Sequence, residues 1–479
     1  MFHNALQHLP RNFRFTKYLL LILAIFTATF FIYRDLGIRM ILGFGVLALF
    51  LLIHLLRCLR LDQPPKLQPV HLPYLALVLV ILLNYLRPDS RHNADSVAYI
   101  IAMLVSFGFV LLAAPSPGEC RLTLKTLTLA GFLMAGFVVF FLIFDDLFWN
   151  TIFHVLSPTA QDYLLVVVPM GYAITLGGCT FSCYILFLGM ASCCASLYNS
   201  AVESRVRFHT LLSYCFFLLA MLLVGRRGEL LGALVCSALL ILAMCPRHRR
   251  WLLIFGSILT LAAVLCLVLA FLPQIRQISF LQRYVETIEN ILAGRDASSG
   301  RFTLYRVAIA AFRENPLFGI GWDQFCTLVP QNYLNNPVIS IEDAHCIYLQ
   351  FLCETGITGA LLIVAPLLYY YWQVCAQFRR LKRQRTNSPE HSLAFRLSTG
   401  SLMLQSFLLF VGIYDPNFQK IVFWSFYSLS ILLLIAALGL EGHRPNDPVS
   451  RLLDRFLDRL RPGLHNLWQT LRTPWKEGK

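Results

Sequence analysis

The chain has 479 residues, of which 57% are hydrophobic and only 14% are charged, and its mean hydropathy is +0.65. Its apolar residues form repeated runs long enough to cross a hydrocarbon layer, so the composition excludes a soluble globular protein and predicts an all-α polytopic membrane protein. The formal net charge of +15 would suggest nucleic-acid binding in a soluble protein. Here the basic residues lie in short loops and at the termini, as the positive-inside rule expects, so nucleic acid is not an expected partner. The 14 cysteines lie mostly inside apolar runs without ligand spacing, which predicts no metal site.

Twelve apolar runs are candidate membrane spans. They cover about residues 18–33, 38–56, 72–86, 97–114, 126–144, 179–198, 211–224, 230–244, 251–272, 347–373, 393–413 and 421–440. A further apolar piece, 163–178, contains Pro169 and ends in a glycine pair. We expect it to be a re-entrant or interfacial segment, with a full span as the alternative.

The distribution of charge predicts the topology. With the N-terminus inside, the basic loops at 57–66, 203–208, 246–250 and 378–385 all face the cytoplasm. The chain then divides into an N-terminal transmembrane bundle (1–272), one large extracytoplasmic loop domain (273–346), C-terminal transmembrane helices (347–440) and a cytoplasmic basic amphipathic tail (441–479). We expect this tail to form an interfacial helix on anionic membrane lipid, because its leucines and its arginines fall on opposite helical faces.

The stretch RRGELLG, Arg226 to Gly232, joins two of these spans and falls on the outer face, against the positive-inside trend. Two guanidiniums at a membrane boundary are unfavourable unless they meet an anion or a carboxylate. Lipid headgroups, a pair with Glu229 and an anionic substrate would each satisfy this requirement. The turn by itself leaves these alternatives open.

The outer segment contains a second group of polar residues. The sequence GRFTLYRVAIAAFRENPLFGIG predicts an amphipathic helix over about 301–312, ended by a proline and two glycines. Arg301, Tyr305 and Ala308 share one face of this helix, and His345 stands at the entrance to the next span. An imidazole and several arginines are thus expected to converge on the outer mouth of a helical bundle.

These motifs, in this order, resemble the O-antigen ligase and polymerase family of bacterial membrane glycosyltransferases. The resemblance rests on the RRG turn, on GRFTLYRVAIAAFRENPLFGIG and on HCIYLQFLCETGITG, and it covers roughly residues 211–366. Cys346 stands where the family usually has Asn. This departure puts in doubt any hydrogen bond from that amide to an acceptor sugar.

The resemblance implies a GT-C-like fold in which an outer loop domain caps a cavity in the membrane body. It further implies transfer of an oligo- or polysaccharide from a polyprenyl (undecaprenyl) diphosphate carrier to a glycan acceptor, without a cofactor or a metal. The acceptor would be a second lipid-linked repeat in a polymerase, and a lipid A core or a protein in a ligase. The expected location is the inner (plasma) membrane, with the active site on the extracytoplasmic face.

Residue roles follow from this chemistry. A departing diphosphate gains negative charge, which fixed guanidiniums can offset in place of a metal ion, and we expect Arg227 and Arg301 to do so. The attacking sugar hydroxyl loses a proton, for which His345 is the expected base. The residues expected to bind substrate are Arg226, Tyr305, Tyr348, Gln350 and Glu354.

Two alternatives remain open at the level of sequence. Gln350 and Glu354 could instead only brace the span below His345. The whole protein could instead be a transporter or flippase of lipid-linked glycan. Such a protein would be expected to show two halves with matching hydropathy or interrupted helices, and the long outer insert has no counterpart in the first half.

Overall fold

The computed structural model describes residues 48–49, 51–56, 58–59, 67–112, 116–156, 158–169, 171–175, 178–197, 204–244, 282–294, 300–329, 343–384, 388–415, 421–442 and 447–476. Within these ranges every regular element is a helix. The longer helices are α4 (Leu72–Tyr85), α5 (Ala94–Leu112), α6 (Pro117–Ile143), α8 (Pro158–Val167), α9 (Cys179–Leu197), α10 (Ser204–Val224), α11 (Arg227–Met244), α14 (Gln282–Leu292), α15 (Arg301–Glu314), α16 (Ile347–Gln384), α17 (Pro389–Val411), α18 (Ile421–Leu440) and α19 (Pro448–Lys476). The short elements are η1 (Pro69–His71), α7 (Asp145–Leu147), η2 (Phe148–Ile152), η3 (Phe153–Val155) and η5 (Phe325–Thr327).

Seven of the described helices are long and apolar enough to cross a membrane, namely α6, α9, α10, α11, α16, α17 and α18. They coincide with seven of the predicted spans, and the shorter apolar helices α4 and α5 coincide with two more. The predicted spans 18–33 and 251–272 lie outside the described residues, and most of 38–56 does too. The multi-pass helical class is therefore confirmed, whereas the count of twelve, the loop domain and the GT-C-like fold stay predictions.

The ambiguous segment 163–178 does not form a long helix. Its helical part belongs to α8, which has ten residues and so extends about 15 Å, half the thickness of a hydrocarbon core. After α8 the chain turns and becomes irregular over 171–175, where the amide of Ala173 donates to the carbonyl of Val224 at the end of α10. This geometry fits a re-entrant or interfacial segment.

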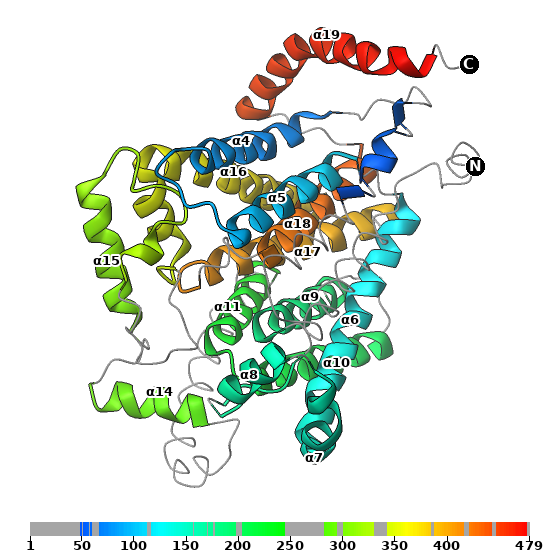
Figure 1. Ribbon diagram of the computed structural model, residues 1–479. Coiled ribbons are helices and arrows are strands. Elements are labelled where there is room, and N and C mark those ends of the chain that lie inside the picture. The colour runs from blue at the N-terminus through cyan, green and yellow to red at the C-terminus, as the bar shows by residue number, and fades with distance from the viewer. Residues whose placement is uncertain are drawn as a thin grey trace.

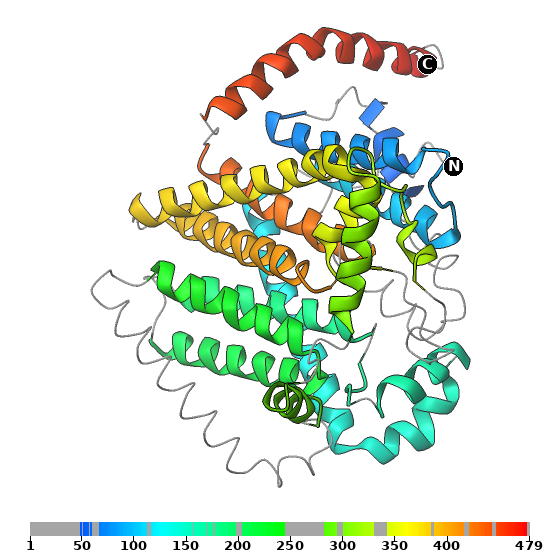
Figure 2. The ribbon, with the colours of Figure 1, turned by 90° about the vertical axis from the view of Figure 1, so that its left-hand side faces the viewer.

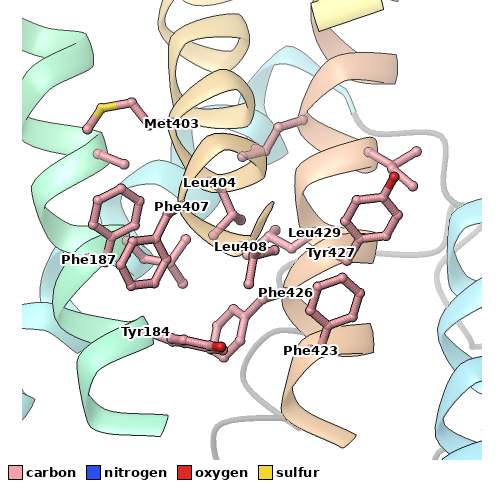
Figure 3. Packing of buried hydrophobic residues seen from close by; sticks show 14 of the residues in the cluster. Tyr184, Phe187, Met403, Leu404, Phe407, Leu408, Phe423, Phe426, Tyr427 and Leu429 are labelled. Atoms are coloured by element: carbon pink, nitrogen blue, oxygen red, sulfur yellow. The ribbon is translucent and has the colours of Figure 1, made fainter. Parts of the chain in front are cut away.

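The core of the bundle is formed by α9, α17 and α18, whose aromatic and leucine side chains interlock (Figure 3). The rings of Phe187 and Phe407 stack with centroids 4.0 Å apart, and Tyr184 meets Phe426 edge-on at 5.6 Å. Lipid tails are as apolar as leucine, so close contacts of this kind, more than the hydrophobic effect, hold membrane helices together.

Polar contacts gather the ends of several helices at one end of the bundle. The Lys382 ammonium near the end of α16 donates to the carbonyl of Ala243 in α11, and Arg380 lies 3.7 Å from the carboxylate of Glu441 after α18. The C-terminal ends of α11, α16 and α18 therefore share one side. This is the alternation that the predicted topology requires, and that side is the predicted cytoplasmic end.

Helix α15 lies at the opposite end, the predicted outer end, where it stands crosswise to α16 and α17 (Figures 1 and 2). It begins at Arg301, as predicted, and continues two residues beyond the predicted end, to Glu314. Its buried face consists of Leu304, Ala308 and Ala311, in one cluster with residues of α16. The amphipathic pattern thus positions Arg301 at the rim of the bundle.

Helix α19 is amphipathic, and it lies along the outside of the helical body (Figure 1). The side chains of Leu452, Phe456 and Leu460 are exposed together, while Leu457 is buried against the body. At its start, the Asp447 carboxylate accepts from the Gln373 amide at 2.7 Å. The helix is therefore tied to α16 at one end, and its contact with anionic lipid stays a prediction.

Candidate functional site

The RRG turn is shaped by Gly225, which connects α10 to α11. Its φ of +81° lies in the left-handed region that favours glycine. A Cβ at this position would also come within 2.5 Å of the carbonyl oxygen of Gly171. The close approach of the irregular segment 171–175 therefore fixes the point from which Arg226 and Arg227 emerge.

Arg226 is the inner arginine of the turn, and its guanidinium is engaged by protein groups. It lies 2.6 Å from the carboxylate of Glu229 and 2.7 Å from that of Asp415, and it donates to the Thr180 hydroxyl at 2.8 Å. The Arg226 side chain is 19% exposed and the two carboxylates only 4% and 6%. The carboxylate alternative for the outer-face arginines is thus realised here. This residue, expected from the sequence to bind substrate, joins α9, α11 and the end of α17.

The two glycines of RRGELLG form a seat for Tyr414. A Cβ at Gly228 would come within 2.2 Å of the Tyr414 ring, and one at Gly232 within 3.2 Å of its hydroxyl and of the Phe410 ring. The Tyr414 hydroxyl donates to the carbonyl of Gly228. Glycines four residues apart on one helix face allow such close approach between membrane helices.

Arg227, the first residue of α11, faces the outer helices instead. Its guanidinium donates to the Thr287 hydroxyl in α14. It is half-buried and lies within electrostatic range of Arg301, Glu286 and Tyr284. Arg227 and Arg301, the two arginines expected to bind diphosphate, are therefore brought together from separate segments.

The cluster continues through Arg301 and Tyr305 on α15 to His345, which lies just before α16. The Tyr305 hydroxyl, one turn after Arg301, lies 3.3 Å from the carbonyl of His345 and 3.4 Å from that of Ile413. Burial raises the pKa of Tyr305, the nearby thiol of Cys346 adds to this, and Arg301 opposes it. We call Arg227, Arg301, Tyr305 and His345 the outer cluster.

His345 has an unusual backbone conformation for a residue with a side chain. Its φ of +49° lies in the left-handed region. Its amide donates to the Asp343 carboxylate at 2.9 Å, and its imidazole Nδ1 lies 3.0 Å from the same oxygen. The ring is 37% exposed, so it stands at the surface of the outer cluster.

Gln350 and Glu354, expected to bind substrate, are each only 1% exposed. Gln350 accepts from the amide of Ala344 at 2.7 Å and donates to Glu354 at 2.6 Å, and Glu354 also accepts from the amide of Phe325 at 3.2 Å. These bonds correspond to the bracing alternative. The hydroxyl of Tyr348, the remaining expected substrate ligand, donates to the carbonyl of Leu409 at 2.8 Å.

The glycine motifs ENPLFGIG and ETGITG bind one another through their backbones. The hydrogen bonds are Ile357 N to Pro316 O (2.9 Å), Thr358 N to Leu317 O (3.3 Å), Ile320 N to Cys353 O (3.0 Å) and Gly321 N to Glu354 O (3.0 Å). They form where α16 is broken at Gly356, which has φ +64° and ψ −173°. A Cβ at Gly356 or at Gly319 would come within 2.3 Å of the opposing backbone. We call this pairing the glycine interlock, and it fixes α15 to α16 just below His345.

The loop between α4 and α5 also reaches this region, a contact that the sequence did not predict. Arg87 donates to the carbonyl of Phe318, and the amide of Trp322 donates to the Ser90 hydroxyl at 3.1 Å. Both loops belong to the predicted outer face. An early and a late part of the chain thus close over the same end of the bundle.

Sequence reasoning found the outer cluster and missed three residues that support it or the neighbouring Arg226. Asp415, which pairs with Arg226, follows directly after a predicted span on the same face as the RRG turn, so a search for an acidic partner could have found it. Asp343 stands two residues before His345, a spacing that signals a side chain able to reach the backbone. Thr287, which accepts from Arg227, has no comparable signal.

Comparison with known proteins now adds to this geometry. Residues 212–364 match the family model described as O-antigen ligase. The match runs from α10 into α16, and it includes the RRG turn, α14, α15, His345 and the glycine interlock. Comparison with curated proteins gives no significant match. Over residues 212–364 the chain is therefore similar to the O-antigen ligase family, which supports the resemblance seen in the sequence.

Proposed function

We propose that the protein is a membrane glycosyltransferase that moves an oligo- or polysaccharide from a polyprenyl diphosphate carrier to a glycan acceptor. The observation that carries this proposal is the outer cluster, in which Arg227 from α11 and Arg301 from α15 lie together and Tyr305 connects them to His345. Two cations beside a titratable base suit a reaction that releases an anion and removes a proton.

The reaction needs one group to stabilise the leaving diphosphate and another to accept the proton of the acceptor hydroxyl. The acceptor oxygen forms a bond to the anomeric carbon, the carbon–oxygen bond to the diphosphate breaks, and its electron pair leaves with the polyprenyl diphosphate. Guanidiniums are planar, remain charged and can hold phosphate oxygens through paired hydrogen bonds. Arg227 and Arg301 therefore stabilise the leaving group, in the role that a metal ion has in other enzymes.

His345 receives the proton of the acceptor hydroxyl. A neutral imidazole can accept a proton near neutral pH, and its partial exposure lets an acceptor approach it. The lipid part of the donor remains in the surrounding bilayer, and the sugars react at the predicted extracytoplasmic face. The acceptor is a second lipid-linked repeat, a lipid A core or a protein.

The rival function is a transporter or flippase of lipid-linked glycan. Cavity arginines would serve such a protein as well, but transport involves no proton transfer from a sugar hydroxyl. The link from His345 through Tyr305 to α15, the helix that carries Arg301, favours group transfer.

The test uses purified full-length protein in lipid, a defined lipid-linked oligosaccharide and each of the acceptors. We expect the wild type to form product, as a ladder on the carrier for a polymerase or as a single transfer for a ligase. Arg227→Ala and Arg301→Ala should abolish transfer and weaken donor binding. His345→Ala should lose transfer while it still binds donor.

The matched control is Arg306→Ala, because Arg306 lies on α15 with an exposed side chain and should be dispensable. A wild type that moves the lipid-linked glycan across a vesicle membrane without forming product would contradict the proposal and support the flippase. Full transfer by the Arg227→Ala or Arg301→Ala variant would remove that arginine from the site.

A further inference from the structure

A single carboxylate oxygen makes two contacts with His345. The Asp343 Oδ1 atom accepts from the amide of His345 at 2.9 Å and lies 3.0 Å from its imidazole Nδ1. Nδ1 is buried, and its contact with the carboxylate is not a well-formed hydrogen bond. Catalytic hydrogen bonds are often poorly aligned in proteins without substrate and tighten in the complex.

The backbone of His345 is held on both sides. The Asp343 carboxylate accepts a hydrogen bond from the His345 amide, and the Tyr305 hydroxyl donates to the His345 carbonyl. The next residue but one, Ile347, donates from its amide to the carbonyl of Gly412 at 2.8 Å. Contacts from α15 and α17 thus fix the left-handed backbone from which the ring projects.

The exposed part of the His345 side chain does not include Nδ1. The side chain is 37% exposed while its Nδ1 atom is buried, so the accessible surface lies on the remaining ring atoms. A carboxylate 3.0 Å from Nδ1 favours the tautomer that carries its proton on Nδ1. That tautomer leaves the lone pair on Nε2, where it can accept a proton. The carboxylate also stabilises the imidazolium that forms when the proton arrives.

We infer that Asp343 is a positioning residue for His345, which selects the tautomer that accepts a proton at Nε2 and holds the ring toward the acceptor. This inference rests on the proposed function, because it gives Asp343 a role in the same transfer. Asp343 touches the base and does not touch the donor.

A purely structural role for Asp343 is the competing explanation, since a carboxylate that accepts from an amide two residues ahead stabilises a turn. Two substitutions separate the roles. Asp343→Asn keeps an oxygen that can cap the amide of His345 but removes the charge, whereas Asp343→Ala removes both. If capping alone matters, Asp343→Asn should behave as the wild type.

We expect Asp343→Asn to lower kcat at least a hundredfold while the KM for the lipid-linked donor and the thermal unfolding midpoint stay unchanged. Asp343→Glu should recover part of the loss. In a His345→Ala background Asp343→Asn should cause no further loss, because residues that act as one unit are not additive. The matched control is Glu314→Gln, which removes an exposed carboxylate from the same outer segment and should leave kcat unchanged.

A second measurement does not depend on transfer. Diethyl pyrocarbonate modifies the unprotonated nitrogen of an imidazole, and mass spectrometry can follow this modification at His345. We expect the limiting rate at high pH, where the imidazole is fully unprotonated, to fall at least tenfold in Asp343→Asn and to stay unchanged in Glu314→Gln. A wild-type rate in Asp343→Asn, or a wild-type kcat, would overturn the inference.

The two proposals fail in different ways. If the wild type transfers no glycan but Asp343→Asn still slows the modification of His345, the glycosyltransferase proposal fails and the Asp343–His345 pair stands. If the wild type transfers glycan and Asp343→Asn has wild-type kcat and modification rate, only the role of Asp343 is lost.

Discussion

The two arginines of the RRG turn are neighbours in the chain and lie in opposite environments. Arg226 meets two buried carboxylates, Glu229 and Asp415, at salt-bridge distance. Arg227 donates to the hydroxyl of Thr287 and lies near a second cation, Arg301, as well as near the carboxylate of Glu286. The inner arginine thus holds the bundle together, whereas the outer arginine connects α11 to the outer helices.

This difference shows how a short motif can combine stability with binding. Consecutive residues at the start of a helix point in directions about 100° apart, so one side chain can turn into the bundle while the next faces the outer helices. An arginine saturated by carboxylates has little capacity left for an anion. An arginine beside another cation is stabilised when an anion binds to both.

The largest expected effect on stability comes from removing Arg226, the inner arginine of the turn. Arg226→Ala should destabilise the protein by about 3–5 kcal/mol, because it leaves two buried carboxylates without their cation. Thermal unfolding in detergent would measure this loss, and Arg227→Ala is the matched control that should keep a near wild-type midpoint. A stable Arg226→Ala variant that fails to bind donor would instead place Arg226 in the donor site.

An intermediate effect on stability is expected at Gly228, one of the two glycines against which Tyr414 packs. Gly228→Ala should cost about 1–3 kcal/mol of stability through overpacking against Tyr414. Gly136→Ala is the matched control, since a Cβ there meets nothing within 4 Å and alanine favours a helix. Chemical or thermal unfolding would compare the two variants, and equal stability would show that Tyr414 can move aside without cost.

The smallest effect on stability should come from Tyr305 in the outer cluster, because its hydrogen bonds are long. Tyr305→Phe removes contacts of 3.3 and 3.4 Å to two carbonyls, so it should cost no more than about 1 kcal/mol of stability. We expect transfer to fall only several-fold, measured as kcat at saturating donor. A loss as complete as that of Arg301→Ala would mean that the Tyr305 hydroxyl contacts substrate itself.

Much of the fold could be predicted from sequence, because apolar length and loop charge are local properties. The spans that became α6, α9, α10, α11, α16, α17 and α18 were recognised in this way, and so was α15. Local patterns also identified Arg227, Arg301 and His345 as residues of one cluster.

The remainder depends on contacts between distant segments. The shared face makes Asp415 a candidate partner of Arg226, but only the three-dimensional arrangement shows that the two side chains meet. The glycine motifs predicted breaks, but their pairing across Gly356 required the three-dimensional arrangement. For the same reason the bracing role of Glu354 could be proposed as an alternative but not chosen.

The position of Asp415 in the chain has a consequence for biogenesis. The RRG turn is synthesised long before α17, and Tyr414 and Asp415 follow that helix directly. Proteins are made from the N-terminus, and their earlier parts wait for the later ones. Arg226 therefore reaches the membrane with Glu229 and Thr180 but without Asp415, and the glycine face of α11 lacks Tyr414 until α17 has entered. A nascent or truncated chain that ends before residue 412 would carry these unfilled contacts, a mark by which membrane quality control could distinguish it from the finished protein.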